Sequence, residues 1–100
     1  MATPEFLDIN PGALHLPSSR LSGADPVKLH DQTRRFGSSL DGMPPVLVYR
    51  GSEAALMIYD GVTRATRAAR QRPGHPIRVE VIRTIARPVG HLPLLGDLLP

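Results

Sequence analysis

Hydrophobic and charged residues alternate most regularly over residues 77–82. Ile77, Val79 and Val81 would lie on one face of an extended segment, and the charged residues between them would lie on the other. A hydrophobic period of two predicts a strand with one buried face.

Shorter apolar runs predict three further strands. Residues 46–49 and 54–59 flank a turn at 51–52, so we expect an antiparallel hairpin. Neither run alternates cleanly, which favours strands covered on both faces. Residues 13–16 predict a short strand within an otherwise loop-rich segment, residues 1–25.

A first helix is predicted at residues 26–36. Asp25 is suited to cap the free N–H groups, Pro26 suits the first helical position, and Gly37 favours the end of the helix. Four residues fall on one helical face, with the last packing just beyond the helix: Leu29, Thr33, Phe36 and Leu40.

Small residues line one side of a second predicted helix, at residues 62–72, which would let it lie close to a sheet. These residues are Val62, Ala65, Ala68 and Ala69. Arg64, Arg67 and Arg70 lie off this stripe, and Pro73-Gly74 ends the helix.

The order of the last three elements is strand, helix, strand, at residues 54–59, 62–72 and 77–82. This order favours a right-handed crossover and a parallel pair of strands. Together with the hairpin it predicts an α+β fold with a small mixed sheet and helices.

One hundred residues predict a single domain, residues 1–100, with its core at about 13–82. The tail at residues 87–100 is rich in leucine and proline. We expect the tail to pack on its own chain. The alternative is an apolar patch offered to a protein partner or to a second copy in a homodimer.

The composition excludes several kinds of covalent link, metal site and catalytic nucleophile. The chain has no cysteine, which excludes disulfides, thiolate metal sites and cysteine nucleophiles. Its four histidines show no metal-ligand spacing, so we expect no zinc site. No apolar run approaches a membrane span, and the N-terminus lacks the pattern of a secretory signal. We therefore expect a cytoplasmic chain with no membrane partner.

Arginine is concentrated in the second half of the chain. Residues 64–87 hold seven arginines and one acidic residue, Glu80. This excess of positive charge suits binding to phosphate or to an acidic partner. The alternative is a charged face that is simply solvated. Arg67, Arg70 and Arg72 suit a nucleic-acid backbone, but no aromatic residues lie among them to favour base stacking.

The sharpest candidate site is the corner at Asp60-Gly61, between the strand at 54–59 and the second helix. The first turn of a helix has free N–H groups that bind anions. Gly61 allows close backbone approach, Thr63 offers a hydroxyl and Arg64 can bind a phosphate with two hydrogen bonds. The alternative is that Gly61 only makes the turn and Arg64 is solvated.

Asp60 has two interpretations. The first is a cap for the second helix. The second is a general base or a ligand of Mg²⁺ beside a bound phosphate, and Mg²⁺ is then the cofactor that this role would use.

The order of elements, with "Pro-Pro-Val-Leu-Val" at residues 44–48 and "Asp-Gly-x-x-Arg" followed by alanines at residues 60–69, resembles the ParB-like nuclease and sulfiredoxin superfamily. The resemblance covers about residues 13–82. It implies a ParB/sulfiredoxin-like fold with a phosphate site at the corner. The motif reads Gly-Glu-Arg-Arg in ParB-type proteins and Gly-Cys-His-Arg in sulfiredoxins, so Gly61 and Arg64 match.

Two positions of the motif depart from the superfamily. Val62 replaces the glutamate or cysteine that carries the chemistry in the relatives, while Thr63 keeps a hydroxyl. Because the chain has no cysteine, a sulfiredoxin reaction is excluded.

These observations lead to two functional hypotheses. The first is a domain that binds phosphate, a nucleotide or nucleic acid through Gly61, Thr63, Arg64 and Arg67. In its enzymatic form it would be a phosphoryl-transfer or nuclease-type effector with Asp60 as the catalytic residue. The second is a non-catalytic protein-interaction module of the same fold, acting through the tail and the arginine-rich face.

Overall fold

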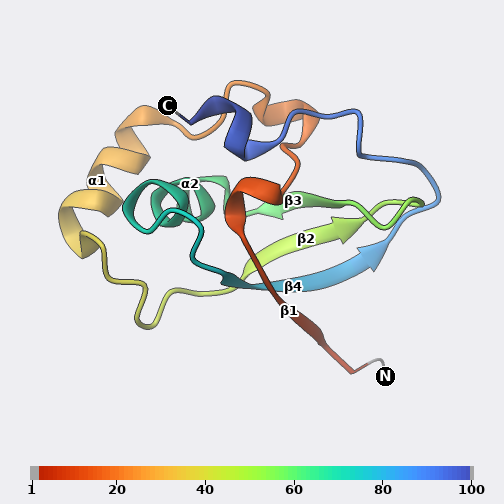
Figure 1. Cartoon of the computed structure of the whole chain (residues 1–100), viewed down its shortest axis with the longest axis horizontal. Coiled ribbons are helices and arrows are strands. Elements are labelled where there is room, and N and C mark those ends of the chain that lie inside the picture. The colour runs from red at the N-terminus through yellow and green to blue at the C-terminus, as the bar shows by residue number, and fades with distance from the viewer. Residues whose placement is uncertain (1–2, 100) are drawn as a thin grey trace.

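A four-stranded mixed sheet forms the framework of the protein, in a computed structural model that describes residues 3–99 (Figure 1). Its strands are β1 (Glu5–Ile9), β2 (Val46–Arg50), β3 (Leu56–Asp60) and β4 (Ile77–Thr84), in the order β1-β4-β2-β3. Strands β2 and β4 are parallel, and the other two neighbouring pairs are antiparallel. With the two α-helices found in residues 3–99, this makes a small compact α+β domain, as predicted.

The β2–β3 hairpin and the alternating strand β4 confirm the predictions from the hydrophobic pattern. Strand β3 starts two residues later than predicted, because Ala54 adopts a positive φ of 72° in the preceding turn. That conformation belongs to turns and not to strands.

The predicted parallel pairing of β3 with β4 is wrong. Strand β2 lies between them, pairs in parallel with β4 and antiparallel with β3, so β3 and β4 run in opposite directions. The end of β3 and the start of β4 both lie beside the start of β2, so helix α2 (Val62–Gln71) connects two strand ends at the same end of the sheet.

The N-terminal segment was predicted to be mostly loop, and this is wrong for β1, which pairs with β4 along one edge of the sheet. Residues 13–16 do not form a regular strand, since a 3₁₀ turn occupies Pro11–Ala13 and only His15 makes isolated bridges, to Met57 and Leu94. The expected common face of Leu14 and Leu16 is confirmed, because both side chains are fully buried.

Helix α1 (Pro26–Phe36) has the predicted bounds. The carboxylate of Asp25 accepts a hydrogen bond from the N–H of Val27 at 2.9 Å, and Gly37 ends the helix with a positive φ. Helix α2 ends one residue earlier than predicted. Neither helix within residues 3–99 has the length and apolarity needed to cross a membrane.

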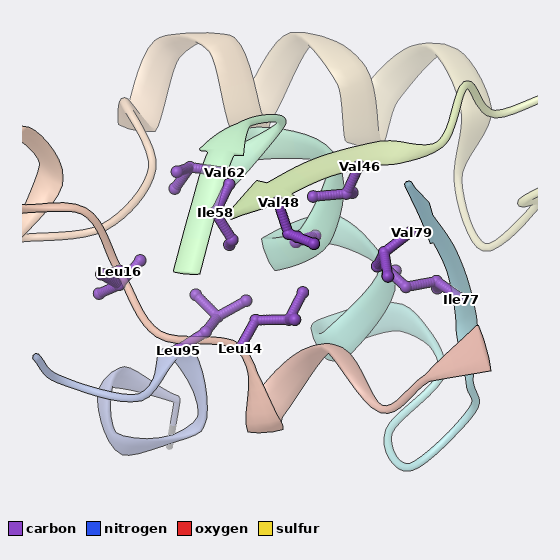
Figure 2. Packing of buried hydrophobic residues seen from close by; sticks show 11 residues of the cluster. Leu14, Leu16, Val46, Val48, Ile58, Val62, Ile77, Val79 and Leu95 are labelled. Carbon is purple, nitrogen blue, oxygen red and sulfur yellow. The ribbon is translucent and has the colours of Figure 1, made fainter. Parts of the chain in front are cut away.

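The core is aliphatic and lies between the sheet, helix α2 and two further segments, one around Leu14 and Leu16 and one around Leu95. Figure 2 shows its side chains pointing into this common space. The labelled members are Leu14, Leu16, Val46, Val48, Ile58, Val62, Ile77, Val79 and Leu95. The predicted stripe of α2 is buried here, so its alanines allow the helix close to the core.

The C-terminal tail packs on its own chain, as expected. Leu95 is buried, and its N–H donates to the carbonyl of Leu14 at 2.8 Å. The N–H of Leu16 donates to the carbonyl of Pro93, also at 2.8 Å. Backbone hydrogen bonds therefore join the segment before α1 to the tail, and both segments cover the core.

The carboxylate of Glu53, in the β2–β3 turn, holds the start of the tail. It accepts hydrogen bonds from the N–H groups of Gly90 and Val89 at 3.1 Å. These hydrogen bonds lower the pKa of Glu53, and the hydrogen bond from Gly90 contributes most.

Candidate functional site

The corner between β3 and α2 turns on Gly61, which has a φ of 112°. A Cβ atom at this position would lie 2.8 Å from Nη2 of Arg64 and 3.2 Å from Cγ2 of Val46. The left-handed backbone therefore requires glycine here, and a Cβ would also make the guanidinium of Arg64 shift.

The N-terminus of α2 has no side-chain cap among residues 3–99, so the prediction that Asp60 caps it is wrong. The physical reason is that Gly61 itself occupies the N-cap position, which places Asp60 one residue too early. The Asp60 carboxylate lies instead 3.7 Å from Nη2 of Arg64. The first N–H groups of α2 are left for another acceptor.

Arg64 is held against the corner with part of its hydrogen-bonding capacity unused. Its Nη2 donates to the carbonyl of Pro45 at 3.1 Å, and its side chain is 21% exposed. Its buried Nε finds no hydrogen-bond acceptor within the described part of the chain. Because the side chain is partly exposed and lines the cleft described below, the protein positions the guanidinium while its exposed part can still donate to a ligand.

A cleft of about 500 Å³ opens in front of this corner. Asp60, Gly61, Thr63 and Arg64 all line it, so the structure brings these four predicted site residues together. The other lining residues come from β3, α1, α2 and the segment before α1: Pro17, Ser19, Arg20, Lys28, Gln32, Tyr59 and Val62.

Arg20 and Lys28 are cleft residues that the sequence did not single out. Both precede the corner by more than thirty residues, in a half of the chain whose charges balance. With Arg64 they place three basic side chains in the cleft, against the single carboxylate of Asp60 that lines it within residues 3–99. This formal excess of two positive charges favours an anionic ligand.

Arg67 is not part of the cleft, and the prediction that it lies off the buried face of α2 is wrong. It is 3% exposed, and its Nη1 donates to the carbonyls of Gly37 and Ser39 at 3.2 and 2.7 Å. Its guanidinium lies 5.3 Å from the centre of the Phe36 ring, and burial lowers its pKa. Arg67 therefore ties α2 to the end of α1.

The remaining candidates lie elsewhere. Arg70 and Arg72 are exposed and do not line the cleft. Across residues 3–99, no group of three or more His, Asp or Glu side chains is placed to hold a metal ion. In this part of the chain a Mg²⁺ role for Asp60 would thus rest on one carboxylate and on oxygens of a bound phosphate.

Comparisons with known proteins add no assignment to this geometry. Neither the protein-family models nor the curated proteins give a match to the chain.

Proposed function

We propose that this chain is a ParB/sulfiredoxin-like domain that binds the phosphate group of a nucleotide or nucleic acid in the cleft at Gly61–Arg64. The observation that carries the proposal is the uncapped N-terminus of α2, which faces a cleft lined by Arg20, Lys28 and Arg64. The helix N-terminus and the basic side chains both attract a negatively charged ligand.

Each part of the corner has a role in holding the anion. The N–H groups of the first turn of α2 donate to phosphate oxygens, and Gly61 lets the ligand approach the backbone. The Thr63 hydroxyl adds a donor. Arg64 binds by charge-assisted hydrogen bonds, which are about twice as strong as those between neutral groups.

The corner supports binding better than bond cleavage. Val62, at the position that carries the chemistry in the superfamily the chain resembles, is an apolar core residue that is 8% exposed. Asp60 already faces the guanidinium of Arg64. A catalytic Asp60 would have to act from this pair, and a nuclease assay with and without Mg²⁺ tests that weaker candidate.

Binding is tested by titrating inorganic phosphate and nucleotides at low salt, followed by NMR or calorimetry. We expect Arg64→Ala to weaken binding by roughly tenfold or more, since hydrogen bonds to charged groups contribute about 1.5–3 kcal/mol. Arg70→Ala is the matched control, because Arg70 is an exposed arginine of the same helix outside the cleft. Equal binding by wild type and Arg64→Ala, or no binding by wild type, would show the proposal to be wrong.

The protein-interaction alternative is less well supported, because the tail that it would use contributes Leu95 to the protein's own core. Truncation before residue 88 separates the hypotheses. We expect the truncated chain to lose stability, whereas an interaction module would keep its fold and lose only self-association in a sizing experiment.

A further inference from the structure

The sheet has an open face, opposite the face that packs against α2. In β2, the fully buried core residues Val46 and Val48 alternate with Leu47 and Tyr49, which are only half-buried and lie outside the core cluster. The rings of Tyr49 and Tyr59 stack on this open face, with their centres 4.9 Å apart. Its apolar side chains are Phe6, Leu47, Tyr49, Met57 and Tyr59. An apolar surface of this kind is typical of a protein interface.

The charges on the open face are balanced. Asp8 and Arg78 lie opposite each other on β1 and β4, and their side chains approach to 3.7 Å. Glu80 and Arg83 follow on β4, and within residues 3–99 neither of them makes an ion pair. The guanidinium of Arg83 lies 6.0 Å from the centre of the Tyr49 ring, which places it on this face. Two acidic and two basic side chains leave no net charge, whereas a nucleic acid requires a positive excess, so the face suits a protein.

The strand register arranges these side chains in two rows across the sheet. Glu80 lies opposite Leu47 in one row, and Arg83 lies opposite Tyr49 in the other. A two-fold rotation about an axis that crosses the strands between the rows would set each row against the other row of a second copy. Glu80 would then face Arg83 of the copy, and Leu47 would face Tyr49 of the copy. Because the contact is symmetric, each pairing would occur twice.

We infer that the open face binds a second copy of this chain, with the two sheets packed face to face and their β4 strands antiparallel. The self-complementary order of the two rows favours a copy of the same chain over an unrelated protein. Sheets packed in this way lie about 10 Å apart, with interdigitating side chains. The interface uses neither the phosphate site nor the tail. Because the face is only four short strands wide, the dimer should dissociate on dilution.

Sedimentation equilibrium of the full chain tests the inference, and we expect the wild type to convert from monomer to dimer as its concentration rises. Glu80→Arg and Arg83→Glu should each raise the dissociation constant by about a hundredfold or more, since each places two like-charged pairs in the interface. Arg78→Glu is the matched control, because Arg78 is an exposed arginine of the same face that pairs with Asp8 of its own chain. It should change the dissociation constant by less than about fivefold. Circular dichroism checks that every variant keeps its fold.

A mixture of the two single variants gives the strictest test. At these two positions the Glu80→Arg chain carries two positive charges, and the Arg83→Glu chain carries two negative charges. Neither variant should associate with itself, but the mixture restores both attractive pairs and should form a heterodimer. A chain with both substitutions should dimerise as the wild type does, because the exchange of charges keeps the pairing. A substitution that acted by damaging the fold would be rescued in neither experiment.

The contrary outcomes are distinct. A wild type that stays monomeric at every concentration would overturn the inference, and a dimer that neither charge reversal weakens would place the interface elsewhere. Weakening by both reversals without rescue in the mixture would overturn the proposed pairing of Glu80 with Arg83. A monomeric wild type that binds a single-stranded oligonucleotide, with the affinity lost in Tyr49→Leu, would replace the second copy by a nucleic acid.

Discussion

Replacing Gly61 with alanine tests how the corner is built. A residue other than glycine held in the left-handed region costs roughly 1–2 kcal/mol. The added Cβ would also meet Nη2 of Arg64 at 2.8 Å and Cγ2 of Val46 at 3.2 Å. The guanidinium is the far end of a flexible side chain and can shift at little cost, so the steric term comes mainly from Val46 and is smaller than the roughly 1–3 kcal/mol of overpacking in a rigid core. We therefore expect Gly61→Ala to reduce the free energy of unfolding by roughly 2–4 kcal/mol.

Gly74→Ala separates the two contributions. Gly74 has a φ of 77°, but a Cβ there would meet nothing within 4 Å. We expect this variant to lose only the backbone term, about 1–2 kcal/mol. For a domain of this size each kcal/mol lowers Tm by roughly 4–8 °C, so thermal unfolding followed by circular dichroism resolves the difference.

The steric term has a functional consequence that the backbone term lacks. Because the guanidinium of Arg64 is the nearest group to the new Cβ, Gly61→Ala should displace it from Pro45 and weaken phosphate binding. Gly74→Ala should bind phosphate as the wild type does. Equal loss of stability in the two variants, with unchanged phosphate affinity, would refute the placement of Arg64 against Gly61.

Three further predictions concern the tail and the buried side chain of Arg67. Because hydrogen bonds lower the pKa of Glu53 in the folded state, its contribution to stability is present above its unfolded pKa and is lost as pH falls through the folded value. Glu53→Gln should therefore flatten the acid side of the stability profile measured by urea unfolding from neutral pH to about pH 3; an unchanged profile contradicts this. Leu95→Ala should destabilise by about 2–5 kcal/mol, whereas Leu98→Ala, at a residue 43% exposed, should change stability far less; similar losses would show that the tail is not seated in the core. Arg67→Met should lower the free energy of unfolding by roughly 1–3 kcal/mol, because it leaves two carbonyls without their donor. It should keep the phosphate affinity within about twofold of the wild type. A large loss of affinity in a folded variant would show that Arg67 belongs to the phosphate site.

Elements whose ends are marked by local chemistry were predictable from the sequence. Asp25, Pro26 and Gly37 fixed both ends of α1, because capping depends on residues within one turn. The period of two identified β4, because each of its alternate residues meets the same core. Strand β1 escaped prediction because it lies at an edge, where Glu5, Phe6 and Asp8 are exposed and the pattern is weak.

Two other predictions were wrong because the elements have more neighbours in the fold than the sequence pattern indicated. Helix α2 was expected to bury a single stripe, but it packs against the core on one side and against α1 on another, and Arg67 falls on that second contact. The pairing of β3 with β4 failed in the same way. Adjacent order in the chain did not reveal that β2 would come between them.

The candidate site shows the same division between local and distant information, and the division bears on its function. Gly61 and Arg64 lie within one turn of each other, so a motif can contain them. Arg20 and Lys28 reach the cleft only because the segment before α1 and helix α1 converge on the N-terminus of α2. The local part of the site provides for a phosphate of any origin. Preference among phosphate compounds must come from the surrounding walls, and for that reason substitutions of Arg20 and Lys28 should change the ligand that the domain selects.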